Sequence, residues 1–127
     1  MTVSAVWDRA RPYIEAALEH AHGTHTVEDV QAAIGAGQLQ LWVGERSAAV
    51  TEFFNYPRRR ALNIFLAGGD LREMKACEPG MAAFARAHGC HFMQCFGRLS
   101  RRERQRSTFA RAADWSAEWV VMTKDLT

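Results

Sequence analysis

The chain has few cysteines, no long apolar run and almost no net charge. Its three cysteines, Cys77, Cys90 and Cys95, are odd in number and none is spaced as C-x-x-C, so we expect reduced thiols and no disulfide framework. No signal peptide is recognisable, which favours a cytoplasmic setting. The apolar stretches are far shorter than the roughly 20 residues of a membrane helix. We therefore expect a soluble protein without a membrane partner.

The net charge of the whole molecule is small, but the basic residues gather in two places. A net charge of +2 on 127 residues is too small to mark the whole surface as a binder of nucleic acid or membrane. Six of the 16 lysines and arginines nevertheless lie within residues 98–111, and three more lie at 58–60. Contact with a polyanion should therefore be local. With 48% apolar residues the chain can close one core, which predicts a single domain over residues 1–127.

Hydrophobic periodicity predicts the elements of the first half. A helix is predicted over residues 8–20. A second helix should begin after Thr26, whose side chain is expected to form a capping box with Asp29. Alternation of period two predicts a hairpin within residues 38–56. The nearly continuous apolar run 61–67 then predicts a third strand that is covered on both faces.

The second half is predicted to continue with a helix that begins at Asp70. Residues 78–80, Glu-Pro-Gly, predict that this helix is kinked or in two pieces. A short strand at 90–96, a basic helix at 100–111 and a last strand at 114–124 complete the order α-α-β-β-β-α-β-α-β. A helix that joins two strands of one sheet implies a crossover. The prediction is an α/β domain with a mixed, mostly antiparallel sheet and helices on both faces.

This order resembles that of the GNAT superfamily, the acyl-CoA N-acyltransferases. In that superfamily two helices precede an antiparallel meander, and the long helix after the third meander strand begins at the acyl-CoA pyrophosphate. The stretches "TVEDVQAAIGAGQLQLWVG", "GGDL", "FARAHGC", Gly97-Arg98 and "TKDL" resemble, more narrowly, small GNAT-like proteins encoded by bacteriophages and prophages near virion genes. The resemblance implies a single GNAT-like domain of phage or prophage origin.

The turn before the long helix departs from the pattern of active members of the superfamily. Their loop reads Gln/Arg-x-x-Gly-x-Gly/Ala, which lets backbone amides close on the pyrophosphate. Here only Gly68 and Gly69 remain, and Asp70 follows. A carboxylate at a helix N-terminus occupies the place of a phosphate and repels it. We therefore expect no cofactor. If acetyl-CoA does bind, Gly68 and Gly69 are the residues expected to contact it.

A second departure follows Gly97-Arg98. Phage relatives usually carry a glycine and a tryptophan soon after this pair, whereas the run "LSRRERQR" follows it here. What the relatives do with this loop therefore does not transfer to this chain.

Candidate catalytic and metal-binding residues are sparse. Glu52 on a predicted strand is a candidate base for amine deprotonation, but it fits better as the polar residue of an alternating strand. No tyrosine follows Tyr56 that could protonate a departing thiolate. The histidines of "HAHGTH", with His91, Cys90 and Cys95, lack the ligand spacings of zinc sites. We expect no catalytic residue and no metal.

The leading interpretation is a non-catalytic GNAT-like protein that acts through contacts with other virion or assembly proteins. It would lie in the host bacterial cytoplasm or be incorporated in a virion. A homo-oligomer and nucleic-acid binding stay as further alternatives, and the competing function is an acyl-CoA-dependent N-acetyltransferase with a degenerate CoA loop. The residues expected to bind the partner are Arg98, Arg101, Arg102, Arg104, Arg106, Arg58, Arg59 and Arg60.

Overall fold

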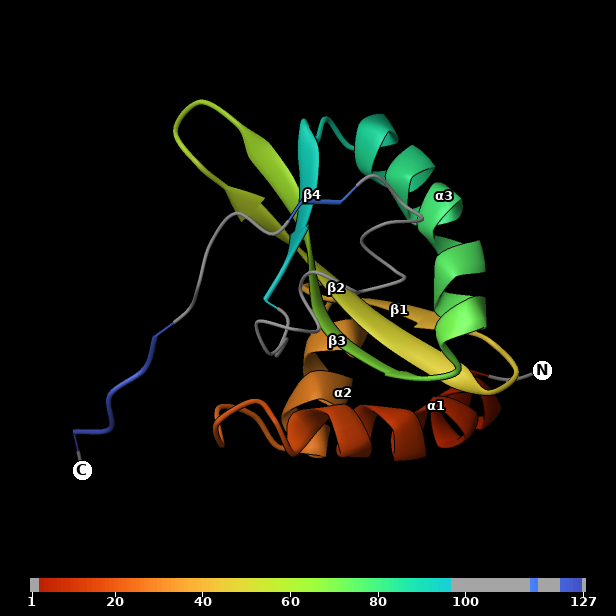
Figure 1. The fold of residues 1–127 in the computed structure, drawn as a ribbon. Helices are drawn as coiled ribbons and strands as arrows, with labels where there is room; N and C mark the ends of the chain where they lie inside the picture. The colour runs from red at the N-terminus through yellow and green to blue at the C-terminus, as the bar shows by residue number, and fades with distance from the viewer. Residues whose placement is uncertain (1–2, 97–114, 117–121, 127) are drawn as a thin grey trace. The chain divides into compact units, whose positions relative to one another are not determined.

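The described residues belong to two compact units. The computed structural model describes residues 3–96, 115–116 and 122–126. The first unit is Met1–Cys95 and the second is Phe96–Thr127. Every helix and strand of the described residues lies in the first unit (Figure 1). No helix in this part of the chain is both long and apolar enough to cross a membrane.

The C-terminal elements predicted from the sequence lie wholly or partly outside the described residues. The predicted helix over residues 100–111 lies outside the described residues, as do residues 117–121 of the predicted last strand. Residues 115–116 and 122–124 form neither helix nor strand, so the predicted ends of that strand are wrong. Met122 there is 88% exposed, so its apolar side chain contributes no burial that would hold a strand in place.

The two N-terminal helices are α1, Val3–Leu18, and α2, Val27–Gly35. Helix α1 begins five residues before the predicted start, because its apolar stripe already begins at Trp7, which is 6% exposed. The capping box of α2 is confirmed. The Asp29 N–H donates to the Thr26 hydroxyl at 3.1 Å, and the Thr26 N–H donates to the Asp29 carboxylate at 2.9 Å.

The sheet has the order β1-β2-β3-β4. Strands β1, Gln40–Val43, β2, Ser47–Asn55, and β3, Arg60–Gly69, form the predicted antiparallel meander. Strand β4, Phe92–Cys95, pairs in parallel with β3. Helix α3, Leu71–Ala87, is the crossover between them (Figure 1). This is the predicted mixed, mostly antiparallel sheet.

Strand β3 is paired with β4 over only part of its length. The parallel register runs from Ala61 opposite Phe92 to Ile64 opposite Cys95. Strand β3 continues to Gly69 and remains paired with β2, with a shift in register between Val50 and Thr51. Strand β4 is thus paired over its whole length, and it ends before the second half of β3.

Helix α3 is one continuous element. It contains Pro79, so the predicted division into two pieces is wrong. Proline removes one backbone hydrogen bond from a helix. Burial of Met81 and Ala85, which are 4% and 3% exposed, packs the second half of α3 against the sheet and offsets that loss.

Apolar side chains pack on both faces of the sheet. On one face Ile14 of α1 and Val30 of α2 are fully buried against Val50 of β2. On the other face Met81 of α3 packs with Leu62 of β3. Figure 1 shows α1 and α2 on one side of the sheet and α3 on the other. Helices on both faces were predicted, and this arrangement confirms them.

Candidate functional site

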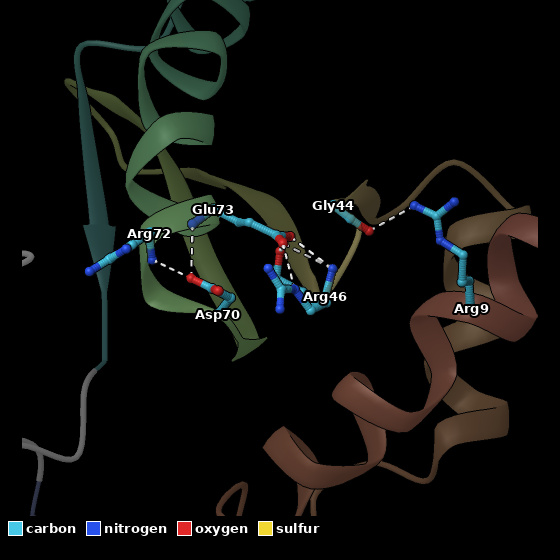
Figure 2. A network of polar contacts seen from close by, with 7 residues as sticks. Arg9, Gly44, Arg46, Asp70, Arg72 and Glu73 are labelled. Atoms are coloured by element: carbon cyan, nitrogen blue, oxygen red, sulfur yellow. Dashed lines mark hydrogen bonds and ion pairs between the residues drawn. The ribbon is translucent and has the colours of Figure 1, made fainter.

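The turn between β3 and α3 is the place where the GNAT resemblance predicts a phosphate. Asp70 is the N-cap of α3, as predicted, and its backbone is extended, with φ −72° and ψ 119°. Its carboxylate accepts hydrogen bonds from the backbone N–H of Arg72 at 2.8 Å and of Glu73 at 3.4 Å (Figure 2). The first N–H groups of a helix have no partner inside the helix. Two of those groups are satisfied here by the chain itself.

The two glycines of this turn are required by close backbone packing. A Cβ on Gly68 would lie 2.5 Å from the carbonyl oxygen of Tyr13 in α1. A Cβ on Gly69 would lie 2.2 Å from the carbonyl oxygen of Arg46, and Gly69 has φ +100°. The Asp70 N–H also donates to the Arg46 carbonyl oxygen at 2.9 Å. The glycines therefore allow α1 and the start of β2 to approach the turn.

A second carboxylate ties α3 to the turn between β1 and β2. Glu73 accepts hydrogen bonds from the Ser47 hydroxyl at 2.7 Å and from the Arg46 N–H at 2.9 and 3.1 Å (Figure 2). These donors hold the pKa of the Glu73 carboxyl below its ordinary value, the Ser47 hydroxyl most strongly. The Arg46 guanidinium lies 3.9 Å away and is 75% exposed, so it adds little.

The same β1–β2 turn is tied to α1. The Arg9 guanidinium donates to the Gly44 carbonyl oxygen at 2.8 Å. A Cβ on Gly44 would lie 2.2 Å from the Glu73 carboxylate. A glycine in the turn thus admits the carboxylate, and one backbone turn joins the first helix to the third.

Next to Glu73 lies a hollow between β1, β2 and α3. Its volume is about 60 Å³, and Trp42, Met74, Cys77 and Met81 are among the residues that line it. Ligand pockets for drug-sized molecules run from about 300 to 1,000 Å³. Burial raises the pKa of the Cys77 thiol. The hollow is smaller than such a pocket, and burial disfavours the thiolate form of Cys77 in it.

Glu52 belongs to a polar row across β2, β3 and β4. Its carboxylate accepts a hydrogen bond from the amide of Asn63 at 3.1 Å, and Asn63 is 1% exposed. Gln94 lies opposite Asn63 on β4 and accepts a hydrogen bond from the Tyr56 hydroxyl at 3.1 Å. Among the described residues, the side-chain oxygen Oδ1 of Asn63 and the side-chain nitrogen Nε2 of Gln94 are buried without a hydrogen-bond partner. Glu52 thus partners a buried amide, the role of a polar strand residue.

The arginines predicted to bind a partner differ in their placement. Arg58 and Arg59 are exposed in the turn between β2 and β3. Arg60 is turned inward, because it donates to the His88 carbonyl oxygen at 2.6 Å and lies 4.0 Å above the Phe53 ring. The five arginines of the 98–106 run lie outside the described residues.

The histidines and cysteines of the described residues form no metal-binding cluster. Within the part of the chain that the structure describes, no group of three or more His, Cys, Asp or Glu side chains could hold a metal ion. His25 packs its ring against Phe65, with 4.7 Å between centroids. His91 accepts a hydrogen bond from the Arg60 N–H at 3.0 Å. These histidines make structural contacts.

Sequence reasoning missed the Glu73 network. The spacing from Asp70 to Glu73 is that of a capping box, which is the local signal available. A capping box would direct Glu73 back to the Asp70 N–H, but that N–H is taken by the Arg46 carbonyl oxygen. Glu73 instead contacts Arg46 and Ser47, more than twenty-five residues earlier in the chain. No local pattern reports such a contact.

Comparison with solved structures shows the fold. The chain is similar to the BH1408 protein from Bacillus halodurans, solved as a tetramutant, with a TM-score of 0.66, 14% identity and coverage of 99% of this chain and 97% of that one. It is also similar to an aminoglycoside acetyltransferase from an uncultured soil metagenomic sample, in complex with sisomicin, with a TM-score of 0.64, 13% identity and coverage of 95% and 87%. The chain has a GNAT-like fold. The chain is similar as well to the TTHA1254 protein from Thermus thermophilus, with a TM-score of 0.65, 13% identity and coverage of 100% and 95%.

Neither a protein-family model nor a curated protein sequence matches the chain. Because the identity is only 13–14%, the similarity to these three structures shows the fold alone.

Replacing Gly68 by alanine should lower the free energy of unfolding. The new Cβ would collide with the Tyr13 backbone, and overpacking of this kind costs about 1–3 kcal/mol. The matched control is Gly80→Ala in α3, where a Cβ meets nothing within 4 Å and should raise the free energy of unfolding by about 0.5–1 kcal/mol. Urea unfolding of both variants measures the difference. A stable Gly68→Ala variant would refute the packing role of this glycine.

Glu73 should make the stability depend on pH in the acid range. Because its pKa is lower in the folded state, the carboxylate stabilises the fold above its unfolded pKa of about 4.3. That contribution is lost as the pH falls through the lower folded pKa. Glu73→Gln should therefore flatten the decline of stability between about pH 6 and pH 3. The control is Glu45→Gln, an exposed carboxylate in the β1–β2 turn. Equal curves for native chain and Glu73→Gln would contradict this role.

Proposed function

We propose that this GNAT-like chain is non-catalytic and acts through contacts with other proteins, as a component of a phage or prophage virion or of its assembly. The observation that carries the first part is the Asp70 carboxylate on the amides of Arg72 and Glu73. These are the donors that a pyrophosphate at this helix N-terminus would use. A phosphate there would have to displace one carboxylate and lie close to a second, and like charges repel. The residues present do not fit an acyl-CoA pyrophosphate.

The glycines support the same proposal. In a phosphate-binding turn, glycines let the backbone approach the ligand. Here the close approach of the Tyr13 and Arg46 carbonyl oxygens already requires glycine at positions 68 and 69. A turn that keeps its glycines for packing can retain the GNAT fold after cofactor binding is lost.

The proposed protein partner meets the arginine run of residues 98–106. Arg102 and Arg106, if helical, form a like-charge pair that costs about 0.2–0.5 kcal/mol. An acidic protein surface offsets this repulsion with charge-assisted hydrogen bonds. The stretches that resemble phage-encoded GNAT-like proteins support the assignment of that partner to a virion or its assembly.

The second candidate is an acyl-CoA-dependent N-acetyltransferase. It is favoured by the fold likeness to an aminoglycoside acetyltransferase. Acetyl-CoA is the cofactor that this candidate requires.

Calorimetry with acetyl-CoA separates the two candidates. The proposal predicts no saturable binding tighter than about 1 mM, because the helix amides are already occupied. Micromolar binding by the native chain would overturn it if Arg72→Glu weakened that binding. Arg72 is exposed beside the turn, so the substitution reverses a charge there without opening the core.

The virion role is tested with purified phage particles. Mass spectrometry should detect the chain in particles or in assembly intermediates of the phage that encodes it. A variant with serine at the five arginines of the 98–106 run should lose this association. The matched control replaces the exposed Arg46 and Arg72 by serine and should keep it. Absence of the native chain from all particle fractions, or unchanged incorporation of the five-fold variant, would overturn the role.

A further inference from the structure

The turn between β2 and β3 carries an exposed positive surface. The Tyr56 N–H donates to the Arg59 carbonyl oxygen at 2.9 Å and closes the turn. Residues 55–59 are exposed, and no Asp or Glu occurs between residues 53 and 62. Figure 1 shows this hairpin extending away from α1 and α2. No carboxylate therefore lies within residues 53–62, and the nearest one on the two strands is Glu52.

Strand β4 brings an aromatic ring to this turn. The rings of Tyr56 and Phe92 are stacked, with 6.1 Å between centroids and 19° between planes. The Arg59 guanidinium lies 4.3 Å from the centroid of Phe92. Tyr56 is 39% exposed, and its hydroxyl donates to Gln94 at 3.1 Å. An exposed aromatic ring thus stacks on the same Phe92 ring as the Arg59 guanidinium, and the exposed Arg58 precedes Arg59 in the turn.

The three arginines of the turn divide by role. Arg60 is used inside the fold by the His88 carbonyl oxygen and the Phe53 ring. Arg58 and Arg59 form no ion pair among the contacts of the described residues. Arg59 stacks on Phe92, which fixes the position of its charge while its N–H groups can still donate.

We propose that Tyr56, Arg58, Arg59 and Phe92, the hairpin surface, bind single-stranded nucleic acid. The guanidinium groups suit phosphates, and the exposed Tyr56 ring, backed by Phe92, suits an unpaired base. Charge with a stacking ring is the combination that single-strand binders use. An acidic peptide would use the arginines and leave the exposed ring without a role. A duplex offers phosphates but no free base face.

The hairpin surface and the Asp70 turn lie at opposite ends of β3, which runs from Arg60 to Gly69. Nucleic-acid binding at the hairpin therefore goes beyond the proposed protein partner and is independent of whether acetyl-CoA binds.

Fluorescence anisotropy with labelled oligothymidine tests the hairpin surface. The native chain should bind, and its affinity should fall as salt rises, because phosphate contacts release counterions. Each phosphate contact on a single strand contributes about −0.7 to the slope of log K against log salt. Arg58→Ser with Arg59→Ser should therefore make the slope less negative by about 1.4. Arg46→Ser with Arg72→Ser, which removes the same charge near the other end of β3, should leave it unchanged.

Substitutions at Tyr56 separate stacking from charge. Tyr56→Leu should weaken binding without changing the salt slope, and Tyr56→Trp should retain it, because only the second keeps a ring for the base. Circular dichroism of each variant confirms that the fold is kept.

The proposal is overturned by any of three results. The first is that the native chain and the Arg58→Ser, Arg59→Ser variant bind oligothymidine with equal affinity. The second is that the native chain binds duplex DNA of the same length as tightly as it binds oligothymidine. The third is tighter binding of a polyglutamate peptide than of oligothymidine at the same salt, which would assign the surface to an acidic protein.

Discussion

Two carboxylates at the start of α3 determine how the rest of the first unit is arranged around the β3–α3 turn. Asp70 satisfies the free amides of the helix, and Glu73 reaches back to Arg46 and Ser47 at the start of β2. Gly68 and Gly69 let α1 and β2 approach this point closely. Helix α1, the β1–β2 turn and α3 therefore meet through short polar contacts that the chain supplies itself. A ligand anion would compete with contacts that also hold the fold.

The contacts of Asp70 and Glu73 lie at the start of α3, where the GNAT resemblance predicts a phosphate. The crossover and the helix N-terminus are present. Two amide donors of that N-terminus, however, are occupied by the Asp70 carboxylate. The fold likeness does not by itself assign acyl transfer to this chain, because a fold fixes where a site lies and the residues at the site decide its chemistry.

Local patterns predicted much of the fold. The Thr26 capping box, the start of α3 at Asp70 and the order of the first seven elements follow from neighbouring residues. Two errors have a tertiary cause. Trp7 extends α1 towards the N-terminus by burial, and the packing of Met81 keeps α3 continuous through a proline that local reasoning takes as a break.

The candidate site was predictable only in part. Asp70 was expected to replace a phosphate because its position in the sequence is enough to place it at the N-cap. The contact from Glu73 to Ser47, the inward turn of Arg60 and the stacking of Phe92 on Tyr56 were not expected. Each of these joins residues from different strands or from a strand and a helix, so register and packing decide them and local spacing does not.

The central claim is that the amides of Arg72 and Glu73 at the start of α3 are occupied by the Asp70 carboxylate. A titration of the 15N-labelled chain with acetyl-CoA, followed by NMR at the backbone amides of Arg72 and Glu73, tests it most directly. We predict that both resonances stay in place at millimolar acetyl-CoA. Saturable movement of these two resonances at micromolar acetyl-CoA would contradict the claim.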